Sequence, residues 1–466
     1  MSELYDLCAI GAGTAGFAAA QAARSLGKSV VLVSGPGDLG GTCILRGCMP
    51  AKTLLSSTER LGDVEHARDV GIRAGEARAD LRAIVERKRE LTDYFAADRR
   101  DELAAFPLAR GSARFVANGA IDVDGRRIEA ERFVIATGSR IVPPAIDGLA
   151  ACRPFTSDDA LDMTAIPSSL IVLGGGPVGC EFAQYFARLG ARVTLVQAEA
   201  TLLRNDDPDV GAALETFLTH DGVEVLTRTT ALAFARDGDA CVAHLARDGE
   251  RLERRAVRVM LATNRLPFYD GLGLETASVR VTARGIDVDA FLRTSNPAVY
   301  AAGDVLGRRN LVHVAAYAGR LAARNAFAPH PERAEFDRFE AHAVYTQPQI
   351  AVAGLDERAC RERGIAYDVR RHPFVDVGKA VVSDEREGFV KMLANVDDGR
   401  ILGVAIVGGE AIDLIGEAIA LLDRRATVTD VAEMPHLHPT MGEIFGRVAE
   451  DFATRQAPLP APAGLR

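Results

Sequence analysis

Two cysteines lie five positions apart near the start of the chain, in the glycine-rich segment GGTCILRGC that ends at Cys48. If a helix opens at Cys43, the chain returns beneath that residue after rather more than one turn, at Cys48. Amide dipoles at a helix start stabilise a thiolate, which is the form of cysteine that exchanges disulfides. A zinc site would need two further ligands at a characteristic spacing, and none lies close in the sequence. The pair is therefore predicted to be a redox-active dithiol and not a metal site.

The other five cysteines are predicted to be small buried hydrophobic residues. The total of seven is odd and is scattered over a long chain, which argues against the disulfide framework of a small secreted protein. Each of the five stands singly in an apolar or mixed stretch, at Cys8, Cys152, Cys180, Cys241 and Cys360.

A glycine-rich turn precedes the dithiol and has the setting of a dinucleotide-binding fingerprint. An apolar run over residues 4–10 leads into the turn, an alanine-rich helical pattern follows to Leu26, and a second apolar run covers residues 30–33. This order of strand, turn, helix and strand presents backbone amides and a positive helix end to a pyrophosphate. The residues predicted to bind the first dinucleotide here are Gly11, Gly13, Thr14, Ala15, Gly16 and Ser34.

The same pattern recurs in the middle of the chain. A strand over residues 169–173 leads into the turn GGGPVG, a helix follows to Leu189, and a further strand covers residues 192–196. One such turn is weak evidence, but two copies in the same frame predict two bound dinucleotides. The residues predicted to bind the second dinucleotide are Gly174, Gly176, Pro177, Val178, Gly179 and Gln197.

The residue at the end of the second strand of such a unit is normally an acid that holds the adenosine ribose. Ser34 and Gln197 occupy this place in the two units, and neither is acidic. Ser34 can still offer a weaker hydrogen bond to a ribose hydroxyl. Gln197 leaves the choice of nicotinamide coenzyme open, but Glu199 would repel a 2′-phosphate and no arginine cluster follows directly. NAD(H) is therefore favoured, and NADP(H) is not excluded.

Four further segments carry a resemblance to a known family. The dithiol segment continues as GGTCILRGCMPAK to Lys52, and ATGS, AGD and HLHPTMGE end at Ser139, Asp304 and Glu443. Together with the two glycine turns, these segments resemble the pyridine nucleotide–disulfide oxidoreductases with a CxxxxC disulfide. The resemblance covers essentially the whole chain and is nearest in pattern to the dihydrolipoamide dehydrogenases.

The resemblance implies roles for individual residues. Cys48 would be the flavin-side thiol and Cys43 the thiol that meets substrate, with His438 as a base oriented by Glu443. It also implies a homodimer in which that pair reaches across from the other subunit. Lys52 would pair with Glu181 near the reactive edge of FAD, and His436 would pack behind the site. Further residues implied to contact a cofactor are Gly41, Thr42, Ala113, Thr137, Gly138, Ser139, Asp304, Leu311, His313 and Asn264.

The fold implied by the resemblance is α/β, with two Rossmann-like dinucleotide-binding domains and a C-terminal α+β dimerisation domain. An FAD-binding domain would comprise residues 1–148 and 269–335, split around an NAD(P)-binding domain at 149–268. The interface domain would comprise residues 336–466, after a linker that contains Pro329 and Pro331.

The composition is that of an ordinary soluble globular protein. The chain has 466 residues, of which 48% are hydrophobic and 26% charged, and its net charge is −9. An acidic chain is a poor partner for nucleic acid or an anionic membrane. The start of the chain shows no signal peptide, and no apolar stretch is long enough to span a bilayer, so a cytoplasmic location is expected.

The substrate is less well specified than the family. The His-x-His-Pro-Thr pattern favours dihydrolipoamide as the substrate, because glutathione reductases usually lack the first histidine. The resemblance implies a lipoyl domain of a 2-oxo acid dehydrogenase complex as one carrier of this substrate. Mercuric reductases carry a C-terminal cysteine pair that is missing here. The departures Ser34, Arg46, Gln197 and Asn264 keep a reductase of another small disulfide, a quinone or a metal ion open. A catalytically idle structural subunit is the alternative of another class, and the intact thiol, Lys52–Glu181 and His438–Glu443 sets argue against it.

Overall fold

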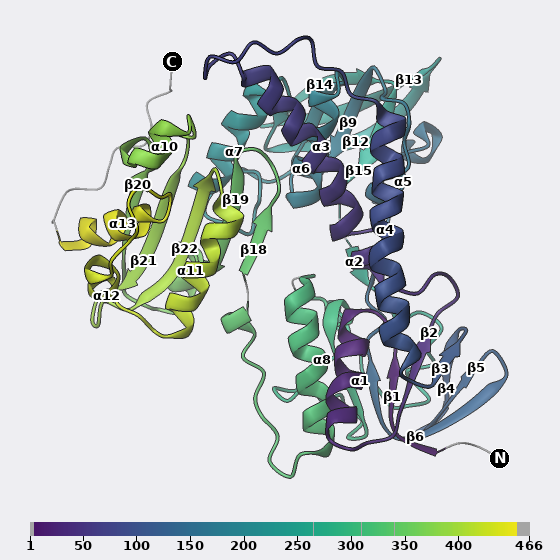
Figure 1. Ribbon diagram of the computed structural model, residues 1–466. Coiled ribbons are helices and arrows are strands. Elements are labelled where there is room, and N and C mark those ends of the chain that lie inside the picture. Colours follow the sequence, from purple (N-terminus) through teal and green to yellow (C-terminus); the bar gives the residue numbers. More distant parts are fainter. Residues whose placement is uncertain (1–3, 264, 309, 340, 454–466) are drawn as a thin grey trace. The chain divides into compact units, whose positions relative to one another are not determined.

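The computed structural model describes residues 4–263, 265–308, 310–339 and 341–453. Its internal contacts divide the chain into two units (Figure 1). The first unit comprises residues 1–54, 82–144 and 263–339, and the second comprises residues 55–81, 145–262 and 340–466. The second unit therefore holds both the predicted nicotinamide segment and the predicted interface segment. The finer boundaries at 148, 268 and 335 stay a prediction.

A seven-stranded sheet forms the centre of the first unit, in the order β3-β2-β1-β6-β5-β4 with β17 beside β6. Strands β1, β2, β3, β6 and β17 run parallel, and β4 and β5 add an antiparallel edge. The predicted strand at residues 4–10 is confirmed as β1. The strands are β1 (Leu4–Ile10), β2 (Val30–Ser34), β3 (Leu108–Arg110), β4 (Ala113–Ala117), β5 (Ala120–Val123), β6 (Arg126–Ile135) and β17 (Val299–Ala301).

Two alanine-rich helices, α1 and α8, pack against each other beside this sheet (Figure 1). Their backbones approach closely at Gly319, where an added Cβ would lie 2.1 Å from the carbonyl oxygen of Ala15. The two-stranded ribbon of β7 and β16 completes the unit, and α3 continues into the second unit. The elements are α1 (Thr14–Ser25), α2 (Thr42–Leu45), α3 (Cys48–His66), α4 (Leu81–Ala104), β7 (Ser139–Ile141), β16 (Arg265–Pro267), η2 (Gly303–Leu306), α8 (Val312–Phe327) and η3 (Phe336–Phe339).

The second unit contains a parallel five-stranded sheet in the order β11-β10-β9-β15-β8. An antiparallel meander, β12-β13-β14, packs near it through a shared apolar core. The elements are η1 (Leu149–Cys152), β8 (Phe155–Thr156), α5 (Ser157–Ala160), β9 (Ser169–Leu173), α6 (Pro177–Arg188), β10 (Arg192–Val196), α7 (Pro208–His220), β11 (Glu224–Leu226), β12 (Thr229–Asp237), β13 (Ala240–Arg247), β14 (Glu250–Ala256) and β15 (Arg258–Leu261).

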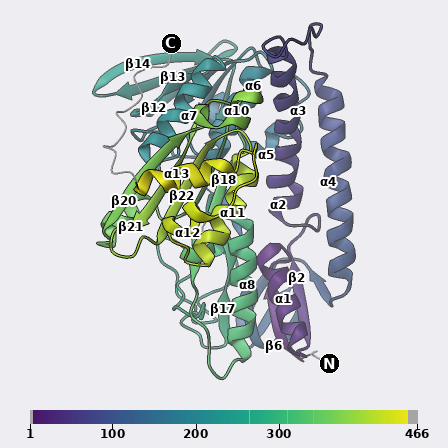
Figure 2. The same cartoon turned by 60° about the vertical axis from the view of Figure 1, so that its left-hand side comes forward.

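The C-terminal part of the second unit is an antiparallel sheet in the order β18-β19-β22-β21-β20. Figure 2 shows α11, α12 and α13 on one side of it, and α11 and α13 contact its strands. The elements are β18 (Ala341–Val344), β19 (Gln349–Gly354), α9 (Glu357–Glu362), β20 (Tyr367–Pro373), η4 (Phe374–Asp376), α10 (Gly378–Val382), β21 (Phe389–Asn395), β22 (Ile401–Gly408), α11 (Ala411–Asp423), α12 (Val428–Glu433) and α13 (Glu443–Ala453).

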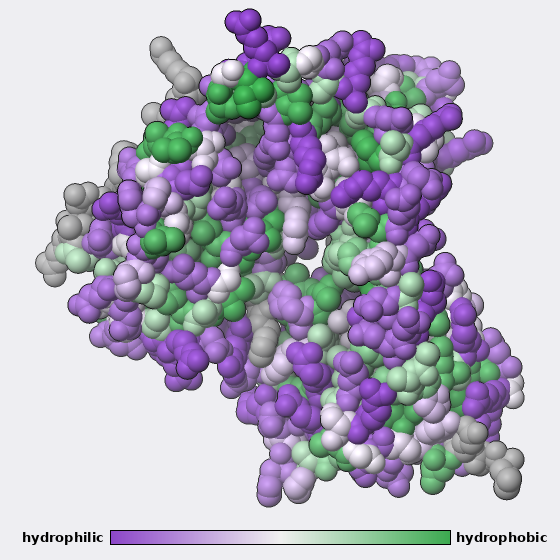
Figure 3. Space-filling view, in the orientation of Figure 1, coloured by the Kyte–Doolittle hydropathy of each residue, from purple (hydrophilic) through white to green (hydrophobic). Residues whose placement is uncertain are grey.

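The predicted fold class is confirmed, with two Rossmann-like sheets followed by an α+β segment. Both predicted strand–turn–helix–strand units are present, as β1-α1-β2 and β9-α6-β10. Within the described part of the chain, no helix is long and apolar enough to cross a membrane. The face visible in Figure 3 mixes hydrophilic and hydrophobic residues.

Candidate functional site

The first glycine turn joins β1 to α1 and tolerates no side chain at two of its glycines. Gly11 has a φ of +117°, and an added Cβ there would lie 2.2 Å from the carbonyl oxygen of Ala136. A Cβ on Gly16 would lie 1.7 Å from the carbonyl oxygen of Gly11. Thr14 and Ala15 are the first residues of α1, so the turn presents the amino end of that helix as predicted.

The residues of this turn fit the pyrophosphate of FAD. Gly13 faces Gly41, and a Cβ added at Gly41 would lie 2.9 Å from the Cα of Gly13. Because neither glycine has a side chain, the backbone of Gly13 and Gly41 beside the start of α1 leaves room for phosphate oxygens. Thr42 follows as the first residue of α2, and Ser34 ends β2 with 9% of its surface exposed. Contact of these residues with FAD stays a prediction.

A second group of predicted flavin residues gathers around Asp304. Ser139 Oγ donates to Asp304 Oδ2 at 2.7 Å, and Arg265 Nε donates to Ser139 Oγ at 3.2 Å. Thr137 Oγ1 donates to the carbonyl oxygen of Phe268, which ties the segment before β7 to the segment after β16. Sequence reasoning missed Arg265. The only signal for it in the sequence is that a cation directly follows Asn264, which is one of the residues implied to contact a cofactor.

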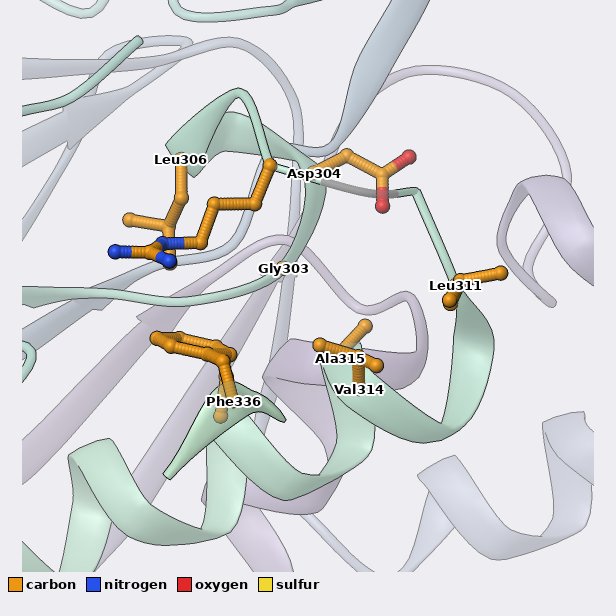
Figure 4. Close-up of a pocket in the computed structure, with 9 residues that line it drawn as sticks. Gly303, Asp304, Leu306, Leu311, Val314, Ala315 and Phe336 are labelled. Atoms are coloured by element: carbon orange, nitrogen blue, oxygen red, sulfur yellow. The ribbon is translucent and has the colours of Figure 1, made fainter. Parts of the chain in front are cut away.

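A pocket lies beside this group within the first unit (Figure 4). The guanidinium carbon of Arg308 lies 4.3 Å from the centre of the Phe336 ring, and Figure 4 shows the Asp304 carboxylate turned away from that ring. His313 is the second residue of α8 and is exposed, and Ala113 begins β4. The pocket is lined by Gly303, Asp304, Leu306, Arg308, Leu311, Val314, Ala315, Ala318 and Phe336.

The two cysteines of the predicted dithiol lie on different helices. Cys43 is the second residue of α2, and Cys48 is the first residue of α3, so the expected single helix is not formed. Gly47 brings them together, because a Cβ there would lie 2.9 Å from the carbonyl oxygen of Thr42 and 3.1 Å from the Cα of Cys43. The two residues are present as thiols, not as a disulfide, and both are half-buried.

The environment of Cys43 disfavours a thiolate when both thiols are reduced. A hydrogen bond with Cys48, together with burial, raises the pKa of Cys43 above its ordinary value. The charge of Arg99 acts in the opposite direction and is a smaller effect. Because the charge of Cys48 contributes to this shift, the shift concerns Cys43 alone, and the predicted thiolate of the pair stays a prediction.

The second glycine turn joins β9 to α6 and repeats the geometry of the first. Gly174 has a φ of +108°, and a Cβ on Gly179 would lie 1.8 Å from the carbonyl oxygen of Gly174. Gly176 is the N-cap of α6, and Pro177 is its first residue, where a missing N–H has no cost. Val178 is 40% exposed. The turn fits a second pyrophosphate.

Gln197 follows β10 and is buried, with its side-chain amide engaged by the protein itself. Its Oε1 accepts from Gly175 N at 3.2 Å, and its Nε2 donates to the carbonyl oxygen of Thr201 at 3.2 Å. Arg204 lies 3.4 Å from Glu199, so a cation does stand beside the acid that favoured NAD(H). The preference for NAD(H) therefore stays a prediction.

Glu181 is the fifth residue of α6 and is 2% exposed. Its Oε1 accepts a hydrogen bond from the backbone N–H of Tyr345 at 2.9 Å, a contact that the sequence did not indicate. Lys52 is half-buried on α3. The pairing of Lys52 with Glu181 stays a prediction, and Asn264 lies outside the described residues.

The predicted base and its partner are in contact near the end of the chain. His438 Nδ1 lies 2.9 Å from Glu443 Oε1, and Glu443 Oε2 accepts from Thr440 N at 3.1 Å. The hydrogen bond from His438, followed by that from Thr440, lowers the pKa of Glu443. The side chain of His438 is 77% exposed, whereas that of His436 is 11% exposed and bonds to Glu417 at 3.0 Å. His438 is thus the histidine that is free to meet a ligand.

Two of the buried cysteines are neighbours in the fold. Cys241 Sγ donates to the carbonyl oxygen of Cys152 at 3.7 Å, although 89 residues separate them. Burial, followed by a hydrogen bond with Cys241, raises the pKa of Cys152 to about 12. The prediction of burial is confirmed for all five cysteines outside the dithiol. The meander folds back on η1, which no local pattern indicates.

Comparison with known proteins places the chain among flavoprotein disulfide oxidoreductases. Residues 5–319 match the family described as pyridine nucleotide-disulphide oxidoreductase, and residues 341–449 match the dimerisation domain of that family. A mercuric reductase from Streptomyces lividans is 37% identical over 99% of this chain and 98% of its own length.

Dihydrolipoyl dehydrogenases are similar along the whole chain as well. The protein from Thermus scotoductus is 35% identical over 96% of this chain and 97% of its own. The one from Bacillus subtilis is 32% identical over 94% and 96%. The structure of the HOCl-induced flavoprotein disulfide reductase RclA from Escherichia coli covers 96% of this chain and 99% of its own, with a TM-score of 0.84 and 24% identity. Relatives whose names give different substrates thus cover this chain to a similar extent and at similar identity. Sequence identity alone therefore does not decide the substrate.

Proposed function

Because the chain belongs to the pyridine nucleotide-disulphide oxidoreductase family, we propose that it oxidises a small dithiol of the dihydrolipoamide type. Members of this family use FAD and a pyridine nucleotide. The residues around Gly13 and Asp304 would hold FAD, and those around Gly176 would hold the nicotinamide coenzyme. Bound FAD supplies two-electron transfer between the dithiol and the nicotinamide.

The hydrogen-bonded pair His438–Glu443 is the observation that carries this proposal. Oxidation of a dithiol to a disulfide releases two protons, whereas a metal ion that takes up two electrons brings no proton. A histidine held by a carboxylate, with its other nitrogen exposed, is suited to accept such a proton.

The proposed reaction begins with the disulfide form of Cys43 and Cys48. A substrate thiol gives its proton to His438, and the thiolate attacks the sulfur of Cys43, so that Cys48 leaves as a thiolate. The second substrate thiol then attacks the sulfur of the first, which releases Cys43. The products are the substrate disulfide and the reduced dithiol, whose two electrons leave towards the nicotinamide.

The base is proposed to come from a second copy of the chain. Support comes from the match of residues 341–449 to a dimerisation domain and from the exposure of His438 in the single chain. A two-fold dimer would form two such sites, each with the dithiol of one copy and the histidine of the other. The lipoyl domain of a 2-oxo acid dehydrogenase complex is the proposed carrier of the substrate.

Reduction of a thiophilic metal ion is the second candidate function. The observation that favours it is the 37% identity to the mercuric reductase from Streptomyces lividans over nearly the whole chain. Soft thiolate ligands select such ions, and Cys43 with Cys48 would supply two of them. This reaction would run from reduced coenzyme to metal and would not need His438.

A substrate panel with a matched variant separates the candidates. The purified holoenzyme is assayed with lipoamide, glutathione disulfide, a quinone and Hg(II), each with NADH and with NADPH, and with dihydrolipoamide together with NAD+ or NADP+. We expect turnover of lipoamide, and we expect His438→Gln to lower it by at least about a hundredfold. Hg(II) turnover that exceeds lipoamide turnover and survives in His438→Gln would favour the second candidate. Turnover of glutathione disulfide with NADPH, but none of dihydrolipoamide with either coenzyme, would reject the proposal.

A further inference from the structure

A buried lysine joins the C-terminal sheet to the nicotinamide segment within the second unit. Lys391 lies on β21 and its side chain is 3% exposed. Its Nζ is 2.9 Å from Asp207 Oδ2, 3.0 Å from Asp209 Oδ1 and 2.6 Å from Glu357 Oε1. Asp207 is the N-cap of α7 and Asp209 is in its first turn, whereas Glu357 begins α9. One cation therefore contacts three acids from two segments of the chain. Lys391, Asp207, Asp209 and Glu357 form one ionic cluster.

Further bonds hold the residues next to this cluster. His342 Nε2 on β18 lies 2.9 Å from Asp206 Oδ1, and both side chains are at most 10% exposed. Asp207 Oδ1 also accepts from the backbone N–H of Glu357 at 3.1 Å. The guanidinium of Arg358 donates to the carbonyl oxygen of Asn205 at 3.4 Å. The C-terminal segment thus holds residues 205–209 by side chain and by backbone, and Figure 1 shows α7 beside this sheet.

Residues 205–207 belong to the loop of residues 198–207, and this loop is also bonded to the second glycine turn. The backbone N–H of Leu203 donates to the carbonyl oxygen of Gly175 at 2.9 Å. The side chain of Leu202 packs so closely that a Cβ added at Gly175 would lie 2.6 Å from its Cδ2. Only Arg204 separates the part of the loop held by Gly175 from the part held by the C-terminal segment.

The cluster is balanced in charge and would lose this balance without its lysine. Arg361 lies 3.3 Å from Glu357, and Arg371 lies 3.9 Å from Asp209, so two arginines complement two of the three acids at the rim. Lys391 is the cation that reaches Asp207, whose side chain is 4% exposed. Removing one partner of a buried pair leaves an uncompensated charge, which the loop would relieve by moving towards water.

We propose that Lys391 is a positioning residue for the pyridine nucleotide. It fixes the loop of residues 198–207 on the C-terminal sheet, and the loop in turn fixes Gly175 and the start of α6, where the pyrophosphate binds. The inference rests on the proposed use of this turn for the nicotinamide coenzyme. A role in stability alone would lower the melting temperature and leave the affinity for coenzyme unchanged.

The test compares two variants of the cluster with one control, all as holoenzymes with FAD. Lys391→Met removes the cation, and Asp207→Asn keeps the shape and the bond from Glu357 N but removes one charge. The control is Arg254→Met, which breaks an ion pair of 2.6 Å with Glu224 in the same part of the unit, away from the 198–207 loop. The dissociation constants of NAD+ and NADP+ are measured by calorimetry, together with FAD content, melting temperature and KM for lipoamide.

We expect both cluster variants to weaken binding of the preferred coenzyme by about tenfold, in the range of ordinary coupling between sites. FAD content and KM for lipoamide should stay within about twofold of wild type, as should coenzyme binding by Arg254→Met. If Lys391→Met does not fold, Asp207→Asn carries the test. Coenzyme binding within about twofold of wild type in the folded cluster variants would overturn the inference. Wild-type protein that binds neither coenzyme would instead overturn the proposed function.

Discussion

At the scale of single residues, exposure separates the dithiol from the other cysteines. Cys43 and Cys48 are half-buried, whereas the remaining five side chains are at most 1% exposed. Burial also raises the pKa of Cys8, Cys180 and Cys360, which makes these thiols poor nucleophiles.

The first prediction follows from this difference. In the reduced native protein, a thiol-alkylating reagent should label two cysteines rapidly, and the other five should react only after denaturation. Cys43→Ser should lower the rapid count by one. Rapid labelling of Cys152 or Cys241, identified by peptide mapping, would contradict the burial described above.

The second prediction concerns the bond between His438 and Glu443. This bond lowers the pKa of Glu443 below its ordinary value, so ionised Glu443 is favoured in the folded state. A depressed pKa contributes stability above the unfolded value, and this contribution is lost as pH falls through the folded value. The melting temperature of wild type should therefore exceed that of Glu443→Gln at pH 6, and the difference should shrink as pH falls below about 4. A difference independent of pH would show that the charge of Glu443 is not what matters.

At the scale of elements, the break between α2 and α3 places the two thiols side by side. Gly47 stands at this break, and the carbonyl oxygen of Thr42 leaves no room there for a side chain. The third prediction is that Gly47→Ala separates the thiols and lowers lipoamide turnover by at least about tenfold, because the reacting sulfurs must meet within van der Waals distance. The number of labelled thiols should stay at two.

A second glycine provides the control for that change. Gly416 lies inside α11, and no atom outside its own helix would meet an added Cβ within 4 Å. Gly416→Ala should keep full turnover and should stabilise the protein by up to about 1 kcal/mol, because alanine is the better helix former. Equal loss of turnover in both variants would mean that the break at Gly47 has no special part in the reaction.

The elements that could be predicted are those with a strong local signal. The apolar runs and glycine turns predicted β1, α1, β9, α6 and β10 with their ends correct to within one or two residues. The fold class and the two glycine turns followed from the same signals. The start of α3 at Cys48 was not predicted, because Gly47 closes the turn by contact with a backbone five residues earlier.

Contacts between distant segments could not be predicted from a single sequence. Lys391 stands in the run GFVKM, where it looks like the solvated lysine of a strand, and only the fold brings Asp207 and Glu357 to it. The backbone N–H of Tyr345 donates to Glu181, and the sequence does not indicate this contact because a backbone donor does not depend on the residue type. Gln197 was expected to contact a ribose, and its side-chain nitrogen donates to the carbonyl oxygen of Thr201 in the loop that follows.

At the scale of the whole molecule, the proposed site needs two copies of the chain. The dithiol belongs to the first unit and His438 to the second. The resemblance and the matched dimerisation domain support exchange between copies. A site shared in this way can be detected by mixing two inactive variants and measuring the activity that returns.

The fourth prediction is that two inactive variants restore each other. Cys43→Ser lacks the thiol that meets substrate, and His438→Gln lacks the base, so each homodimer should be inactive with lipoamide. Random exchange of subunits at equal concentration makes half of the dimers mixed, and each mixed dimer has one site with both an intact dithiol and an intact histidine. Activity should therefore rise to about a quarter of wild type if the sites are shared across a two-fold interface.

A control and a contrary result complete this test. Cys43→Ser mixed with Cys48→Ser should stay inactive, because both thiols of a site come from the same copy and no mixed dimer contains an intact pair. The exchange itself is verified by mass spectrometry of the native dimer with one variant isotopically labelled. Complete exchange without any recovery of activity in the first mixture would place His438 in the same copy as its dithiol, or remove it from the reaction altogether. The two cases are then separated by the single variant, since His438→Gln alone loses turnover only in the first.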